Sequence, residues 1–199
     1  MKIVLASNNP GKLAEFRQNM PKHKILSLKD LNIDVEINET GRTFYENALI
    51  KANEVAKYTK YPVIADDSGL LVDVLNGEPG IMSARYAGEN ATDEENMQKL
   101  LKALKNKKDR RAKFMTTIVL RLKNGKIISA SAGVAGSILE QPVGKNGFGY
   151  DPLFYCDELD KPFGVATEEE KNSVSHRSRA IALILSQLEC VALKLLKIN

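Results

Sequence analysis

Apolar runs that predict strands alternate with helical patterns through the first 65 residues, and this order constrains the fold more than any other feature of the chain. Residues 2–6 read as a short buried strand, and residues 10–20 as a helix opened by a proline. Thr43 and Glu46 form a capping box, which predicts a second helix to about residue 60. Strand-like alternation occurs within residues 25–37, between the two helices, and residues 63–65 are a third apolar segment. The β-α-β-α-β order predicts an α/β fold in which helices cover a sheet.

The rest of the chain extends this sheet. Residues 112–122 and 126–138 are strand-rich runs separated by Lys123-Asn124-Gly125, a strong hairpin signal, so the predicted sheet is mixed. The other predicted elements are a helix opening at Thr92, a short helix opening at Thr167 and a longer helix from Ser175 towards Leu196.

Composition places the chain among globular proteins. Its 199 residues fit a single domain, residues 1–199, with 43% hydrophobic and 27% charged residues and a net charge of +4. We expect no membrane span, no signal peptide and a cytoplasmic location. The basic run over residues 102–113 lacks interleaved aromatic residues, so we expect a solvated connection and no nucleic-acid partner. Cys156 and Cys190 lack metal-ligand spacing and are expected to be reduced thiols.

Two adjacent carboxylates, Asp66 and Asp67, follow the third apolar segment. Neighbouring charges resist burial unless a metal, an arginine or a proton offsets the cost. We expect them in a turn at the carboxyl end of a buried strand, where open α/β sheets bind ligands. Glu39, in a predicted turn, is a candidate partner of Asp67 around Mg²⁺, which needs only one or two carboxylates beside substrate phosphates. The alternative is that Asp66 caps the turn and Asp67 is solvated.

Two further segments have polar residues at the start or on one face of a predicted helix. SNNPGK, residues 7–12, joins the first strand to a helix N-terminus and offers backbone N–H groups and Lys12. It lacks the P-loop pattern, and an ordinary strand-to-helix turn explains it equally well. Asn47 and Lys51 are four residues apart and share one helix face, which points either into a cleft or to solvent.

A last pair of segments has the residue types that hold flat heterocycles. GKNGFGYDP, residues 144–152, offers an aromatic ring and a carboxylate on a glycine-rich backbone. KNSVSHR, residues 171–177, ends in His176 and Arg177, which can donate to keto oxygens or phosphates. The alternative for this His-Arg pair is a surface or capping role.

SNNPGK, TFYENALIKA, ADDSGLLVDVLNGEPGIMSARYAG, GFGYDPLF and KNSVSHR, in this order, closely resemble the inosine triphosphate pyrophosphatase family, also called Ham1-like or XTP/dITP diphosphatases. The resemblance covers nearly the whole chain. It implies magnesium-dependent hydrolysis of XTP, ITP and dITP to the monophosphate and pyrophosphate, without ranking these substrates. It also implies an elongated mixed sheet with two α/β lobes flanking a substrate cleft, and a homodimer.

The resemblance also implies roles for individual residues. Asp67 is the expected proton acceptor and, with Glu39, a metal ligand; Asn38 precedes Glu39 where many relatives have a second acid. The residues expected to contact the nucleotide are Ser7, Asn8, Asn9, Pro10, Gly11, Lys12, Lys51, Ser68, Phe148, Gly149, Tyr150, Asp151, Lys171, His176 and Arg177.

Three other functions fit the sequence less well. Maf-like nucleotide hydrolases prefer other bases, and the FGYDP and SHR segments argue against that group. A nucleotide sensor without hydrolytic activity needs no carboxylate beside the phosphates. A dehydrogenase is disfavoured because no GxGxxG motif follows the first strand.

Overall fold

The computed structural model describes residues 1–196, with side chains to residue 190. The strands are β1 (Lys2–Leu5), β2 (Lys24–Leu26), β3 (Val63–Val72), β4 (Arg111–Arg121), β5 (Ile127–Ile138), β6 (Phe154–Cys156) and β7 (Lys161–Pro162). The α-helices are α1 (Pro10–Asn19), α2 (Phe44–Ala56), α3 (Asp93–Ala103), α4 (Glu168–Val174) and α5 (His176–Leu196). Short 3₁₀ turns occupy Lys29–Leu31, Asp73–Leu75, Gly80–Arg85 and Asp151–Leu153.

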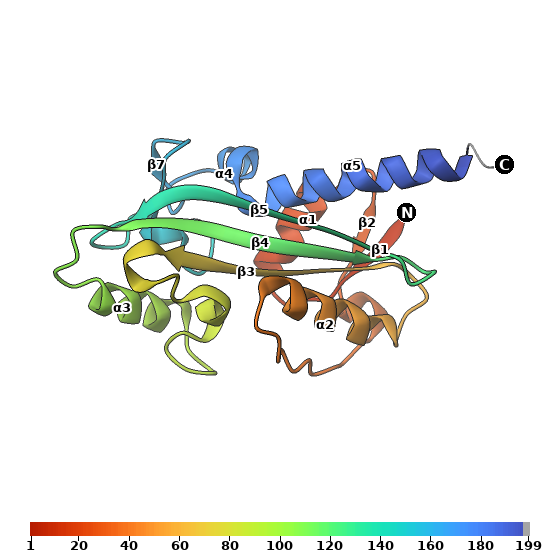
Figure 1. The fold of residues 1–199 in the computed structure, drawn as a ribbon, viewed down its shortest axis with the longest axis horizontal. Coiled ribbons are helices and arrows are strands. Elements are labelled where there is room, and N and C mark those ends of the chain that lie inside the picture. The colour runs from red at the N-terminus through yellow and green to blue at the C-terminus, as the bar shows by residue number, and fades with distance from the viewer. Residues whose placement is uncertain (197–199) are drawn as a thin grey trace. The chain divides into compact units, whose positions relative to one another are not determined.

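Within residues 1–196 the strands form one seven-stranded mixed sheet in the order β2-β1-β3-β4-β5-β6-β7 (Figure 1). β1 is parallel to both of its neighbours, β2 and β3, whereas β6 is antiparallel to β5 and β7. The turn between β4 and β5 has Gly125 at φ +83° and a 2.8 Å bond from Leu122 N–H to the carbonyl of Lys126. The α/β class, the mixed sheet and this turn were all predicted from the sequence and are confirmed.

The chain divides into two compact units, and the divisions fall inside β3, β4 and β5 and after the first residue of α5. The first unit contains Met1–Asp67, Thr116–Ala132 and the described residues from Arg177 onward. One of its cores includes Leu5, Ile64 and Ile181, and brings α1 and α5 against one face of the sheet. Its other core includes Val63 and Ala65, and brings α2 against the opposite face (Figure 1).

The second unit contains Ser68–Met115 and Gly133–His176. Its core is rich in aromatic side chains: the ring centroids of Phe114 and Phe154 are 4.6 Å apart, and those of Phe154 and Phe163 are 5.2 Å apart. Leu100 of α3 is fully buried in this core, and Val174 of α4 packs against it. Both helices are therefore fixed by their apolar residues, which leaves their first turns available for hydrogen bonding to loops.

Local capping explains where several helices begin. Thr43 accepts a 3.1 Å bond from the N–H of Glu46 at the start of α2. Full capping boxes, Thr92 with Glu95 and Thr167 with Glu170, open α3 and α4 as predicted. α2 ends at Ala56, four residues before the predicted end.

The predicted strand character within residues 25–37 was wrong beyond β2. Residues 32–42 have no helix or strand, although Val35 and Ile37 are half-buried against the core of the first unit. Alternation of apolar residues reports which side chains are buried, and it does not provide a neighbouring strand to bond with. Cys156 and Cys190 are free thiols, and within the described residues no helix combines the length and apolarity needed to cross a bilayer.

Candidate active site

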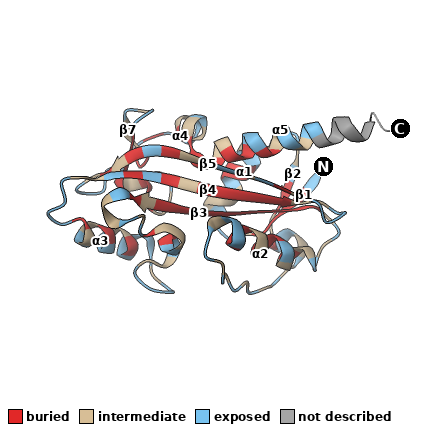
Figure 2. Cartoon of the chain, viewed as in Figure 1, coloured by how far each residue is buried: buried red, intermediate tan, exposed pale blue. Residues whose placement is uncertain are grey.

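Asp66 and Asp67 lie inside β3, which runs from Val63 to Val72, and not in a turn at its end. The prediction of a turn was therefore wrong. Almost every residue of this strand is buried (Figure 2), and the exposed fractions of Asp66 and Asp67 are 1% and 7%. Side chains of consecutive strand residues point to opposite faces of a sheet, so the two carboxylates enter different environments. Each environment supplies its own cations.

Asp66 faces α1 and the start of α5. Its Oδ2 atom lies 3.0 Å from Nζ of Lys12 and accepts a 3.1 Å bond from Nε of Arg177. Arg177, itself 1% exposed, also pairs with Glu15 of α1. Burial alone would raise the pKa of Asp66, but the charges of Lys12 and Arg177 hold that pKa well below its ordinary value. The lowered pKa favours the ionised form of Asp66 between these two cations.

Lys12 reaches Asp66 because of the way α1 begins. Asn9 caps the helix by accepting a 3.0 Å bond from the N–H of Lys12, and Pro10 occupies the first helical position. Ser7 accepts a 3.2 Å bond from the N–H of Asn9. The predicted loop from Ser7 to Lys12, including Asn8 and Gly11, thus leads from β1 into a capped helix N-terminus, where backbone N–H groups favour anions.

Asp67 faces α2. Its Oδ2 atom accepts a 3.0 Å bond from Nδ2 of Asn47, and its Oδ1 atom lies 3.5 Å from Nζ of Lys51. Nζ of Lys51 also donates to Oε1 of Glu39 at 3.1 Å. Burial raises the pKa of Asp67, only partly opposed by Lys51 and Asn47. Burial would lower the pKa of Lys51, but Asp67, Asp66 and Glu39 together raise it.

The approach of α2 depends on Gly41. Its N–H donates to Oδ1 of Asn47 at 2.8 Å, so Asn47 connects the turn before the helix to Asp67. A Cβ atom at position 41 would lie 2.6 Å from that Oδ1 atom, too close for any side chain. The predicted shared face of Asn47 and Lys51 is confirmed, and it points at a buried carboxylate.

Glu39 and Asp67 provide a donor set that fits Mg²⁺. Nζ of Lys51 lies 3.1 Å from a carboxylate oxygen of Glu39 and 3.5 Å from a carboxylate oxygen of Asp67. Oxygen ligands of this kind suit a hard divalent cation that completes its coordination with water and substrate phosphates. Across the described part of the chain, no three His, Cys, Asp or Glu side chains gather as a complete metal site. Whether these two carboxylates hold Mg²⁺, as the sequence predicts, stays a prediction.

The second unit holds a separate polar cluster around Asp151. Oδ2 of Asp151 accepts bonds from Nζ of Lys171 at 2.7 Å and from the N–H of Phe148 at 2.8 Å. Nζ of Lys171 also lies 4.8 Å from the centre of the Phe148 ring, a cation–π distance. Gly147 allows this turn, because it has φ +79° and a Cβ atom there would lie 2.1 Å from Oδ2 of Asp151. Sequence reasoning named these residues, and the structure brings Phe148, Asp151 and Lys171 together.

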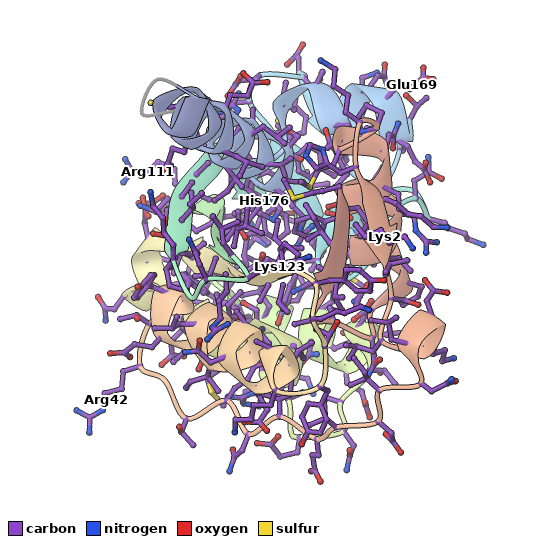
Figure 3. All side chains as sticks on the ribbon, turned by 90° about the vertical axis from the view of Figure 1, so that its right-hand side faces the viewer. Lys2, Arg42, Arg111, Lys123, Glu169 and His176 are labelled. Atoms are coloured by element: carbon purple, nitrogen blue, oxygen red, sulfur yellow. The ribbon has the colours of Figure 1, made fainter. Side chains whose placement is uncertain are left out.

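Tyr150 and His176, which are also predicted to contact the nucleotide, are buried among other residues of the second unit. Tyr150 is 5% exposed and donates from its hydroxyl to the carbonyl of Ser83 at 2.9 Å, and burial raises its pKa. His176 is 4% exposed and stacks on Phe114 with ring centroids 5.0 Å apart. Figure 3 shows His176 inside the structure and Glu169 at its periphery. Ser68 is half-buried in β3.

Two residues of the site have contacts that were not predicted. Asn47 was predicted only to share a helix face with Lys51, and Glu15 was not predicted to belong to the site. Asn47 fixes Oδ2 of Asp67, and its spacing from Lys51 was the available signal. Glu15 pairs with Arg177, and its position three residues after Lys12 on α1 was the only hint. Neither pairing can be read from local sequence, because the partners are far apart in the chain.

Known proteins resemble this chain along most of its length. A model of the Ham1 family matches residues 3–187. The chain belongs to the Ham1 family. The resemblance seen in the sequence is thereby confirmed.

Relatives and solved structures support the same family. A protein of Staphylococcus aureus strain MW2 named dITP/XTP pyrophosphatase is 46% identical, covering 94% of this chain and 96% of its own length. A Treponema denticola protein of the same name is 47% identical, with 91% and 95% covered. The structure of the Staphylococcus aureus Ham1 protein aligns with a TM-score of 0.85 and 46% identity, covering 95% of this chain and 98% of that one.

Proposed function

We propose that this Ham1 family member hydrolyses the non-canonical purine nucleotides XTP, ITP and dITP to the monophosphate and pyrophosphate, with Mg²⁺ as cofactor and Asp67 as the proton acceptor. The names of its relatives support the reaction class. The observation that carries the mechanism is the buried Asp67 carboxylate, whose pKa is raised and which has a lysine, an amide and a second carboxylate around it.

The raised pKa of Asp67 and the lowered pKa of Asp66 suit different tasks. A carboxylate that accepts a proton during turnover works best when its pKa lies closer to the working pH, so Asp67 fits a general base. Asp66 holds its charge and fits the task of fixing Lys12 and Arg177. Neighbouring carboxylates whose pKa values are pushed apart by their surroundings are typical of acid–base sites.

Each group near Asp67 has a definable part in the reaction. Asn47 restrains rotation of the carboxylate by holding Oδ2, so that the carboxylate can orient a water and take its proton. Lys51 keeps its positive charge, because its pKa is raised, and attracts the phosphates. Glu39 and Asp67 would hold Mg²⁺, which screens phosphate charge when bound.

We propose that the second unit recognises the nucleobase. Phe148 offers an aromatic face for stacking, with Lys171 and Asp151 fixed beside it. Hypoxanthine and xanthine carry a 6-keto group where adenine carries an amino group, so a site with hydrogen-bond donors discriminates against adenine. That His176 and Arg177 supply those donors stays a prediction, as does the contact of Ser68 with the substrate.

The test is a pyrophosphate-release assay with ITP, XTP, dITP, ATP, GTP, dTTP and UTP, with and without Mg²⁺. We expect release from the first three only, dependent on Mg²⁺, with the monophosphate as the second product. Preference for a pyrimidine would favour a Maf-like specificity, and binding without turnover would favour a sensor; either result would contradict the proposal. We also propose a cytoplasmic homodimer, on the family resemblance, for which light scattering gives the mass.

A further inference from the structure

The peptide groups on both sides of Phe148 are held by carboxylates. The N–H of Phe148 donates to Oδ2 of Asp151 at 2.8 Å. The next N–H, that of Gly149, donates to Oδ2 of Asp93 at 2.6 Å. Asp93 is the first residue of α3 and lies 56 residues earlier in the sequence. Because the Phe148 Cα atom lies between these two amides, fixing both peptide planes fixes the direction in which its ring leaves the backbone.

The backbone of this loop needs such restraint. Gly147 and Gly149 have φ values of +79° and +61°, in the region that favours glycine. A glycine on each side gives the segment more conformational freedom than other residues would allow. Asp151 is close in sequence and bonds only the first of the two amides. Asp93 restrains the second amide from outside the loop.

The start of α3 holds a second loop in the same way. Asn96, three residues after Asp93 and 2% exposed, donates from Nδ2 to the carbonyl of Ala84 at 3.2 Å and accepts from the N–H of Ala87 at 2.7 Å. The Tyr150 hydroxyl donates to the carbonyl of Ser83, the residue before Ala84. The first turns of α3 and Tyr150 therefore join residues 148–150 to residues 83–87 through four hydrogen bonds.

We infer that Asp93 is a positioning residue for nucleobase recognition, acting through the Gly149 amide to hold the Phe148 ring in its stacking orientation. The inference rests on the proposed function, because it assumes that Phe148 stacks on the base. Asp93 itself need not touch the substrate. Its loss should weaken binding of the base more than it slows the chemical step, since Asp67 belongs to the other unit.

The test compares Asp93→Ala with Asp93→Asn and with a matched control, Glu94→Ala. Glu94 is the next residue of α3 and is also exposed, so its replacement removes the same favourable charge from the helix N-terminus without removing the bond to Gly149. Asp93→Asn keeps an acceptor oxygen and should restore part of the effect. The readouts are hydrogen exchange of the Gly149 amide by NMR, and kcat and KM for ITP.

For Asp93→Ala we expect about tenfold faster exchange of the Gly149 amide, about tenfold higher KM and little change in kcat. A tenfold change is the size expected for the loss of one charge-assisted hydrogen bond. Glu94→Ala should match the wild type in all three. Equal behaviour of the two alanine variants, or an equal loss in kcat, would overturn the inference. If the wild type failed to hydrolyse ITP, the proposed function would fail, while Gly149 exchange would still report whether Asp93 holds the loop.

Discussion

Replacement of Asp67 by asparagine should remove turnover and leave the fold intact. An amide has nearly the same shape as the carboxylate, and its oxygen can still accept the bond from Asn47. It cannot accept a proton from water. General base catalysis contributes about 10²–10⁴-fold to a rate, so kcat for ITP should fall by at least about 100-fold.

The fold should tolerate this change because the ionised form of Asp67 is not favoured by folding. Its pKa is raised from 3.8 by burial, so any stability contributed by its ionisation equilibrium is present below the unfolded pKa and lost as pH rises through the folded one. Lys51 keeps Glu39 as a partner at 3.1 Å when Asp67 loses its charge. At neutral pH the variant should therefore unfold within about 1 kcal/mol of the wild type.

The neighbouring residue provides the matched control. Asp66→Asn leaves Lys12 and Arg177 without the carboxylate between them, in a fully buried position. Breaking a buried ion pair costs about 3–5 kcal/mol, and in a chain of this size each kcal/mol lowers Tm by about 2–4 °C, so Tm should fall by about 6–20 °C. One strand thus carries two isosteric substitutions with opposite expected outcomes.

The measurements are pyrophosphate release with ITP and Mg²⁺, and thermal unfolding followed by circular dichroism. In Asp67→Asn, kcat should fall while Tm stays close to that of the wild type. In Asp66→Asn, Tm should fall. If Asp67→Asn kept more than about a tenth of the wild-type kcat, Asp67 would not be the base. If Asp66→Asn melted with the wild type, the argument from buried charge would be wrong.

Three further outcomes are expected. Arg177→Ala should lower the free energy of unfolding in urea by about 3–5 kcal/mol, because the buried carboxylates of Glu15 and Asp66 lose the guanidinium that pairs with both; an unchanged midpoint would contradict this. Asn47→Ala removes a hydrogen bond that lowers the pKa of Asp67, so that pKa should rise. The acid limb of the pH profile of kcat/KM, where protonation of Asp67 stops the reaction, should therefore move to higher pH. An unmoved acid limb would show that Asn47 does not stabilise the Asp67 carboxylate. Glu39→Gln should raise the Mg²⁺ concentration for half-maximal rate at least about tenfold and weaken Mg²⁺ binding measured by calorimetry, and equal Mg²⁺ affinities would remove Glu39 from the metal site.

Local physics explains why much of the fold could be predicted. The capping boxes at Thr92 and Thr167 act within four residues, and the turn at Gly125 needs a φ value that glycine adopts easily. A few adjacent residues therefore determine each of these features. The same holds for the GFGYD segment, whose turn depends on Gly147 lying against Asp151 four residues later. Motif order then sufficed to identify the family.

The sequence by itself determined the mixed α/β sheet, the family and the set of polar residues available for chemistry. Tertiary structure decided which partners the two adjacent aspartates have. Their adjacency argued for a turn, because two charges in a strand interior have no local compensation. The compensation comes from residues as distant as Arg177, 111 positions away from Asp66, and from Lys51 and Asn47 on α2. Strand geometry sends the side chains to opposite faces, so only the packing of helices on those faces could make one carboxylate an anchor and the other a candidate base.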